Sequence, residues 1–408
     1  MNVTGIIAEY NPFHKGHLYH LEESKAMTES DITVVVMSGN FMQRGEIAMA
    51  DKWIRAESAV RCGADLVLEL PFVFACNSAE YFAKGAMDIL RGLQCITHIS
   101  FGSENGNLEP LKRAAELLTK ESPEFKKELE YSLGKGNSYP RARWEALVAC
   151  YGQKTAAAVQ MPNDILAVEY IKQAISVGWD VKFNAVKRQG AGFLDSNLKA
   201  EPVSATGIRN KFIEQERVGE ILEYLPEESA KVFKREEGRI YGVPERFYWL
   251  LAYKVATTEI EGLAKVFSIG EGLENKLKKA FSTERDIESV FRFINTKRYT
   301  ETRIRRILIH TLFGFNKCDM NLILSQNISY CRVLGFSEKG AALLRRIKRE
   351  RISSLPIITN INKEVSRDDP IEKLLKWDIM SGDIYNILHG RDPYRDSEYL
   401  RKPYVHDK

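Results

Sequence analysis

The feature that most constrains the fold is an alternation, in the first hundred residues, between short apolar runs and segments with helical spacing. The runs are rich in β-branched residues, and each is followed by a helical segment. Apolar runs occupy residues 3–8, 32–37, 65–70 and 95–101, and helical segments occupy 16–28, 51–62 and 78–93. Continuous apolar strands separated by helices indicate parallel strands covered on both faces. The sequence therefore predicts an α/β fold with a doubly wound parallel sheet.

Later segments are mostly helical. Residues 108–177 are predicted to form a helical insertion, 180–186 a further strand, and 245–388 an almost entirely helical region. A stretch with Gly238, Gly242 and Pro244 is typical of a domain boundary. We therefore expect a catalytic domain over residues 1–235 and a mainly helical, basic C-terminal domain over 240–408.

Cysteine usage and hydropathy bear on the compartment. None of the six cysteines lies in a Cys-x-x-Cys pair, so neither a zinc site nor a disulfide framework is expected. No apolar run approaches the roughly 20 residues that a membrane span needs. The first residues also lack the charge and the apolar length of a signal peptide. We expect a cytoplasmic protein without a membrane partner.

Ligands of doubly wound sheets bind beyond the carboxyl ends of the strands, and the loop 11–17 follows the first predicted strand. It begins a helix, whose free N–H groups and positive dipole end attract phosphate. Gly16 lets the backbone approach a phosphate closely, and Pro12 stiffens the entry to the loop. His14 and His17 can donate ring N–H groups to phosphoryl oxygens. The loop is predicted to be a phosphate site.

Two other interpretations of this loop compete. His14, His17 and His20 are three residues apart and could hold a metal, but no His-Glu-x-x-His pattern or carboxylate partner accompanies them. A chance cluster in an exposed loop is the other alternative. The position at the first strand-to-helix turn favours phosphate binding, and no metal ligand is predicted.

A second segment, Val-Ser-Ala-Thr-Gly-Ile-Arg at 203–209, suits the same chemistry. Ser204 or Thr206 can cap a helix and bind phosphate oxygens, and Arg209 can neutralise charge. A plain helix N-cap is the alternative. Together the segments resemble the two signatures of the HIGH-motif nucleotidylyltransferase superfamily. The catalytic candidates are His14, Lys15, His17, Ser204, Thr206 and Arg209.

Longer blocks narrow the resemblance to one family, the bacterial tRNA(Met) cytidine acetate ligases. They occupy residues 5–17, 37–41, 43–45, 63–65, 69–71, 101–104, 162–166 and 187–188. The resemblance implies a nucleotidylyltransferase-like domain followed by a helical, basic tRNA-binding domain. It also implies ATP contacts at Ile7, Ala8, Glu9, Tyr10, Asn11, Pro12, Phe13, His14, Lys15, Gly16, His17, Leu18, Tyr19, His20, Gly102, Asn163 and Arg188.

The activity that this resemblance implies has two steps. Acetate and ATP give acetyl-adenylate and pyrophosphate, and the acetyl group then passes to N4 of the wobble cytidine of elongator tRNA(Met). The product is N4-acetylcytidine, and acetyl-coenzyme A is not used. Because acetate is already ionised, the first step needs positioning and charge stabilisation rather than a base. Mg²⁺ is expected to accompany ATP, although the sequence shows no dedicated carboxylate cage.

The loop 38–45 is a candidate acetate pocket. Asn40 or Gln43 could bind a carboxylate, and Arg44 could face acetate or RNA. A purely structural turn after the second strand explains the loop equally well.

Between Lys297 and Arg351 the chain has 13 Lys/Arg and 4 Asp/Glu, a local charge of +9 against +4 overall. Such a block favours a polyanionic partner. The candidate RNA contacts are Arg298, Arg303, Arg306, Arg345, Arg346 and Arg349. A solvated helix face is the alternative.

Two rival functions remain open at this stage. One is a small-molecule adenylyltransferase or pantothenate-synthetase-like ligase, which would not need the basic half. The other is a non-catalytic RNA-binding protein with a relict nucleotide site, against which the intact motifs argue.

Overall fold

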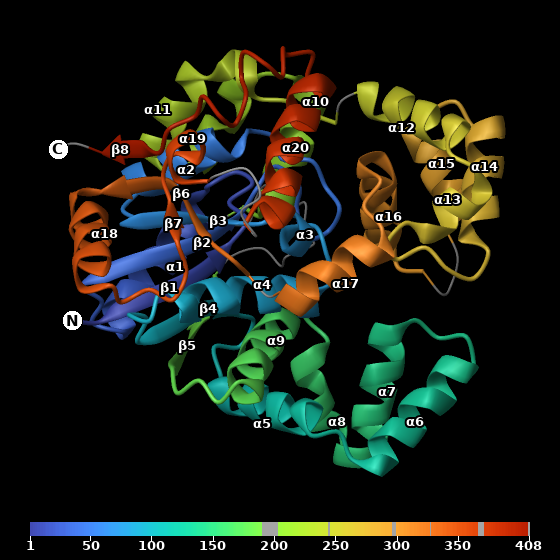
Figure 1. Ribbon diagram of the computed structural model, residues 1–408. Helices are drawn as coiled ribbons and strands as arrows, with labels where there is room; N and C mark the ends of the chain where they lie inside the picture. Colours follow the sequence, from blue (N-terminus) through green and yellow to red (C-terminus); the bar gives the residue numbers. More distant parts are fainter. Residues whose placement is uncertain (190–202, 244, 296–298, 327, 366–370, 407–408) are drawn as a thin grey trace.

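The computed structural model describes residues 1–189, 203–243, 245–295, 299–326, 328–365 and 371–406 (Figure 1). One sheet runs through the centre, in the order β5-β4-β1-β2-β3-β6-β7, with β8 pairing with β6. Its first five strands are β1 (Val3–Ala8), β2 (Ile32–Ser38), β3 (Leu66–Leu70), β4 (His98–Ser103) and β5 (Lys182–Lys187). All five are mutually parallel where they pair. The predicted α/β class and the strands that define it are confirmed.

Alternation along β2 explains the two covered faces. Val34 and Val36 belong to the core that includes α4 (Ala79–Gly92). Val35 and Met37 face the other core, with α1 (Lys15–Met27) and α2 (Lys52–Arg61). Successive side chains of a strand point to opposite faces, so an unbroken apolar run serves both cores.

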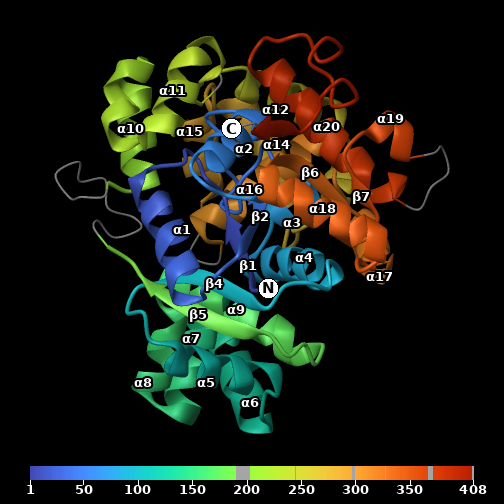
Figure 2. The ribbon, with the colours of Figure 1, turned by 90° about the vertical axis from the view of Figure 1, so that its left-hand side faces the viewer.

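The helical insertion lies beyond β5, at one end of the sheet (Figure 2). Residues 108–176 form helices, as predicted from their spacing. The helices are α5 (Leu108–Thr119), α6 (Pro123–Gly134), α7 (Tyr139–Tyr151), α8 (Gln153–Ala156) and α9 (Pro162–Ser176). Pro123 and Pro162 stand in the first turns of α6 and α9, where the missing N–H costs no helix bond.

The chain after residue 240 is mainly helical, as expected. It contains α12 (Arg246–Thr257), α13 (Ile260–Lys265), α14 (Leu273–Thr283), α15 (Ile287–Ile294), α16 (Glu301–Phe313), α17 (Lys317–Gln326), α18 (Glu338–Glu350), α19 (Ile361–Glu364) and α20 (Glu372–Leu388). Two groups of helices lie earlier in the chain. The short α3 (Phe72–Ala75) lies between α2 and α4, and α10 (Ala205–Gln215) and α11 (Glu227–Arg235) follow β5.

The expectation of an almost entirely helical C-terminal half needs a correction, because this half returns to the sheet. β6 (Cys331–Ser337) pairs antiparallel with β3, and it is joined by β7 (Ile357–Ile358) and β8 (Tyr404–His406). The short run of β6 lies inside a basic, otherwise helical stretch, so its local pattern is weak. Its partner strand lies more than 260 residues away and supplies the pairing that the local sequence does not show.

A buried ionic network joins the two halves. Lys52 Nζ lies 2.6 Å from Glu69 and 3.1 Å from Glu398, while Arg332 lies 3.3 Å from Glu69 and 2.7 Å from Glu398. Each of these side chains is at most 3% exposed. Two cations and two carboxylates balance, so removing one partner would leave a charge buried without compensation. The sheet and the C-terminal segment therefore share one core.

Candidate active site

The two histidines of the first loop cap α1 with their own rings. His14 Nδ1 accepts a hydrogen bond from the backbone N–H of Gly16 at 3.0 Å, and His17 Nδ1 accepts from the N–H of His14 at 3.3 Å. The ring centroids are 3.8 Å apart, and the ring planes are tilted by 32°. Because each Nδ1 accepts, each neutral ring carries its proton on Nε2. The His14 ring is therefore a hydrogen-bond donor toward a ligand, whereas the N–H of the His17 ring also bonds to the Pro12 backbone.

Burial keeps these rings uncharged. Burial lowers the pKa of His14 to about 3, and the nearby cations Arg188 and Arg209 lower it further. Burial also holds the pKa of His17 well below its usual value, with His14, His20 and Arg188 adding to the effect and a bond to the Pro12 backbone opposing it. Burial lowers the pKa of His20 to about 4. The positive charge of this site must come from arginine, lysine and the helix dipole.

Three separate segments converge on one side of this loop. A Cβ added to Gly102 would lie 3.6 Å from Arg188 Cγ and 4.0 Å from His20 Cδ2, so the end of β4 faces both side chains. The backbone N–H of Arg188 donates to the Ser103 carbonyl at 3.0 Å, which continues the pairing of β4 with β5. Arg188 is thereby held at the carboxyl edge, beside the histidines.

Asn163 belongs to the same region. Its amide donates to Glu104 Oε1 at 2.7 Å, and Glu104 follows β4 directly. The next residue, Asp164, accepts from the Ser103 hydroxyl at 2.7 Å and from the Glu104 N–H at 3.1 Å. These bonds fix the first turn of α9 to the loop after β4, so the predicted ATP residues outside the first loop gather at one edge.

The second motif meets the first loop through Arg209. Its Nη1 donates to the Asn11 carbonyl at 2.9 Å, and its Nη2 donates to Glu46 at 2.7 Å and to Thr206 Oγ1 at 3.4 Å. Ser204 is the N-cap of α10 and accepts from the Gly207 N–H at 3.1 Å. Ser204 thus caps α10, and phosphate binding by Ser204 and Thr206 stays a prediction. Through Arg209, the start of α10 also faces the histidine loop.

The loop 38–45 has mainly structural partners for its amide side chains. Asn40 is buried, and its Oδ1 accepts from the Lys52 N–H at 2.8 Å, which anchors the start of α2. Gln43 donates its backbone N–H to Glu9 at 2.7 Å and its side chain to the Asn77 carbonyl at 3.1 Å. Arg44 is half-buried; burial lowers its pKa, and the carboxylates of Glu46 and Glu9 oppose this.

Arg55 is a site residue that the sequence pattern missed. It is fully buried and donates to backbone carbonyls only: Ala50 at 3.0 Å, Glu9 at 2.7 Å, Ser38 at 3.1 Å and also Gly39. One guanidinium therefore ties together the ends of β1 and β2 and the loop between β2 and α2. The sequence signal was weak, because α2 also contains Lys52, Glu57 and Arg61, so charge alone does not single out Arg55.

The two basic clusters lie far apart. Arg306, on α16, is half-buried and donates to the Gln43 carbonyl at 3.0 Å, and Arg303 covers the Tyr299 ring at 4.4 Å. Arg298 lies outside the described residues. The α18 arginines Arg345, Arg346 and Arg349 are exposed, and the last two contact Glu350 at 3.0 and 2.7 Å.

The placement of α18 follows from its attachment to β6. The Ser337 N–H at its start donates to the Asp65 carbonyl, just before β3, so α18 lies at the amino edge of the sheet. Figure 1 shows α16 and α18 on opposite sides of the molecule.

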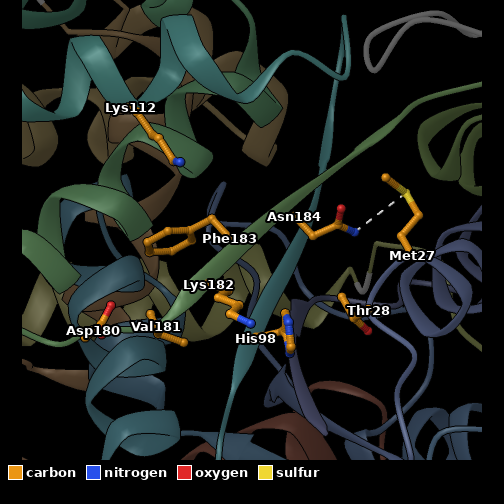
Figure 3. Close-up of a pocket in the computed structure, with 9 residues that line it drawn as sticks. All are labelled: Met27, Thr28, His98, Lys112, Asp180, Val181, Lys182, Phe183 and Asn184. Carbon is orange, nitrogen blue, oxygen red and sulfur yellow. Dashed lines mark hydrogen bonds between the residues drawn. The ribbon is translucent and has the colours of Figure 1, made fainter.

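A pocket at the amino ends of β4 and β5 is a separate feature (Figure 3). It is lined by Met27, Thr28, His98, Lys112, Asp180, Val181, Lys182, Phe183 and Asn184. Asn184 donates to the Met27 sulfur at 3.7 Å, and burial lowers the pKa of His98. None of the predicted site residues lines it, because those residues follow the carboxyl ends of the strands.

The described residues show neither a metal-binding cluster nor a membrane-spanning helix. They contain no group of three or more His, Cys, Asp or Glu side chains placed to hold a metal ion. Nor does any helix within the described ranges have the length and apolar character needed to cross a membrane.

Comparison with known proteins defines the class first. A family model described as HIGH Nucleotidyl Transferase matches residues 1–398. A crystal structure of Thermotoga maritima TmcAL without ligand superposes with a TM-score of 0.93 and 34% identity over 99% of each chain. A second crystal structure of that protein, bound with alpha-thio ATP, gives a TM-score of 0.89. The fold and the paired motifs thus define a HIGH nucleotidyl transferase.

Curated relatives then define the family. The tRNA(Met) cytidine acetate ligase of Caldanaerobacter subterraneus subsp. tengcongensis is 40% identical over 394 residues, covering 95% of this chain and 96% of the relative. The ligase of Clostridium tetani is 36% identical over 413 residues and covers 99% of both chains. The chain belongs to the tRNA(Met) cytidine acetate ligase family.

Proposed function

We propose that this protein activates acetate with ATP and transfers the acetyl group to N4 of the wobble cytidine of elongator tRNA(Met), forming N4-acetylcytidine. The meeting of the two motifs through Arg209 carries the proposal, because it joins the histidine loop to the start of α10 in one nucleotide site. The name of the relatives supports the RNA substrate, and the alpha-thio ATP complex of the Thermotoga protein supports the nucleotide.

ATP would lie along residues 7–20, with its phosphates over the N-terminus of α1. The neutral Nε2–H groups of His14 and His17 would donate to phosphoryl oxygens, and Lys15 and Arg209 would supply charge. Ser204 and Thr206 would add hydroxyl contacts, while Gly102, Asn163 and Arg188 would line the nucleotide from the β4 and β5 side.

In the first step, an acetate oxygen attacks the α-phosphorus. The bond from that phosphorus to the bridging oxygen of the β-phosphate breaks, and pyrophosphate leaves with the electron pair. No base is required, so the chain contributes alignment and donors to the developing charge. Mg²⁺ would neutralise the triphosphate. Since the described residues offer no ligand cluster, phosphates and water rather than the protein would hold most of its coordination sphere.

In the second step, the cytidine N4 attacks the acetyl carbonyl carbon. The carbon–oxygen bond to AMP breaks, N4 loses a proton, and the amide of N4-acetylcytidine forms. ATP supplies the activation, so acetyl-coenzyme A would not be needed. We place this reaction in the cytoplasm, where the tRNA substrate of such an enzyme is found.

The tRNA would approach the carboxyl edge, because the acetyl-adenylate would form there. Arg303 on α16 faces this side and is our proposed phosphate contact, beside the Tyr299 ring. The α18 arginines lie at the opposite edge, and Arg346 and Arg349 contact Glu350 on their own helix, which favours a solvated helix face.

Mass spectrometry of tRNA nucleosides tests the proposal. After incubation with ATP, acetate and elongator tRNA(Met), we expect a mass gain of one acetyl group on cytidine. Replacing acetate by acetyl-coenzyme A without ATP should give no product. Modification that requires acetyl-coenzyme A, or turnover of a small acceptor without tRNA, would contradict the proposal.

A further inference from the structure

Arg306 is a half-buried cation in contact with the loop 38–45, and within the described residues no carboxylate compensates it. Within the described residues, its guanidinium donates to the Gln43 carbonyl at 3.0 Å and forms no ion pair. Arg209 and Arg332 each have a carboxylate partner at 2.7 Å. The fully buried Arg55 has four backbone carbonyls as acceptors, whereas Arg306 has one. A covered cation without a counterion costs free energy that an anionic ligand can recover.

The groups around Arg306 do not supply that counterion. Burial lowers the pKa of Arg306 to about 10, and the cations Arg303 and Arg44 lower it further; only the Cys76 thiol opposes this. Burial raises the pKa of Cys76 to about 12, so this thiol is neutral at pH 7. Arg306 is therefore a positive charge that faces like charges and a neutral thiol.

The helix that carries Arg306 packs closely on the loop 38–45. A Cβ at Gly45, where φ is +75°, would lie 2.4 Å from the Arg306 backbone nitrogen, so only glycine allows this approach. Phe313 stacks on Phe72 at 4.0 Å, and His310 bonds to the Cys76 carbonyl at 2.8 Å. A guanidinium held this way is preorganised rather than a mobile surface charge.

The same contacts place the guanidinium near the chemistry. Gln43 accepts from Arg306 through its carbonyl and donates its own N–H to Glu9, the residue that follows β1. Burial raises the pKa of Glu9, and the positive charge of Arg209, which contacts the histidine loop, opposes this shift. Gln43 thus connects Arg306 to Glu9, which follows β1 directly. The proposed acetyl-adenylate would form at this end of β1.

We propose that Arg306 binds the carboxylate of acetate, so that the C-terminal half contributes a substrate-binding residue to the site on the sheet. This inference rests on the proposed function. A planar guanidinium matches a carboxylate through two parallel hydrogen bonds. The sequence suggested that Arg306 binds an RNA phosphate, and we now assign it to the carboxylate of acetate. Both ligands are oxygen anions that a guanidinium can bind.

Exchange of labelled pyrophosphate into ATP, measured without tRNA, tests this assignment through the KM for acetate. Arg306→Gln should raise that KM about 10- to 100-fold, the loss of a charge-assisted hydrogen-bond pair, and leave the KM for ATP near wild type. Arg305→Gln is the matched control, because Arg305 pairs with Glu301 on its own helix. It should leave both constants unchanged.

Each other outcome overturns the proposal in a different way. An unchanged KM for acetate with weakened tRNA binding would make Arg306 an RNA-phosphate contact. Unchanged values for both would exclude an anion site. If Arg306→Gln does not fold, Arg306→Lys decides, since it keeps the charge and loses the planar pair; an unchanged KM for acetate would then overturn the assignment. Wild-type protein without acetate-dependent exchange would instead remove the proposed function itself.

Discussion

The two edges of the central sheet both carry basic residues, but they use them differently. At the carboxyl edge, Arg55 and Arg209 are covered and donate to backbone carbonyls of the loops that follow β1 and β2. At the amino edge, Arg346 and Arg349 on α18 are exposed and face a glutamate of their own helix. In the sequence, the segment that carries Arg346 and Arg349 is more basic than the segments that carry Arg55 and Arg209. Burial and backbone contact, rather than charge count, separate a site from a solvated surface.

The largest expected effect comes from His17. His17→Ala removes a neutral Nε2–H donor at the N-terminus of α1 and should reduce acetate-dependent pyrophosphate exchange by at least about 100-fold. His98→Ala, in the pocket at the amino edge, is the comparison variant and should retain wild-type exchange. Filter binding should show that His17→Ala still binds tRNA. Loss of RNA binding in His17→Ala, or an equal loss of pyrophosphate exchange in His98→Ala, would contradict the assignment of the nucleotide site to the carboxyl edge.

The buried network should give the next largest effect, on stability. Glu398→Gln removes one of two carboxylates that compensate Lys52 and Arg332, and the expected loss is about 3–5 kcal/mol in the free energy of unfolding. Urea denaturation measures it, with the exposed Glu350→Gln as control. A change below about 1 kcal/mol would show that the C-terminal segment is not part of the core. For the same reason, a chain truncated near residue 240 should not fold, and its inactivity would not distinguish a tRNA ligase from a small-molecule enzyme.

Arg55 should give an intermediate effect on turnover. Arg55→Lys keeps a charge but cannot reach four carbonyls with one planar group, so the loops after β1 and β2 lose their common anchor. We expect kcat for pyrophosphate exchange to fall about 10-fold or more, since misplacement near the chemistry is costly. Arg61→Lys, at the other end of α2, is the control. Equal losses of stability in both variants with unchanged kcat would remove the positioning role.

Acidification should weaken the fold gradually through its buried histidines. Burial lowers the pKa of His14 to about 3 and that of His20, His310 and His389 to about 4. The unfolded chain binds their protons near its ordinary value of about 6.5. Between these limits the unfolded state holds more protons, so stability should fall as pH decreases from about 6.5 toward 4. Urea midpoints at several pH values measure this trend. A midpoint that rises on acidification would contradict the neutral rings.

The smallest effect is expected at the amino edge. Replacing Arg345, Arg346 and Arg349 together by Gln should change tRNA affinity less than about fivefold, because exposed charges with a local partner contribute little. Arg303→Gln at the carboxyl edge should weaken binding more and reduce its salt dependence. The reverse ranking would assign the RNA surface to α18.

Features that depend on neighbouring residues could be predicted from the sequence, whereas features that depend on distant contacts could not. Apolar runs with strand character predict β1 to β5, and the Ser204 cap predicts the start of α10, because these signals lie within a few neighbouring residues. The histidine loop also follows from local order, since any strand-to-helix turn exposes free N–H groups. These features made the sheet class and the position of the histidine loop predictable from the amino-acid sequence alone, while phosphate binding by that loop stays a prediction.

Only the tertiary structure decided which distant residues complete the site and the core. Glu69 meets Arg332 across 263 residues, and Arg306 meets Gln43 across the same separation. Nothing in the periodicity around Arg55 or Arg306 shows what each guanidinium faces, because that depends on loops packed from elsewhere in the chain. The sequence by itself predicted β1 to β5, the helices between them and a histidine loop at the first strand-to-helix turn. Packing decided that β6 closes the sheet, that Arg55 holds the loops, and that a helix from the C-terminal half covers the site.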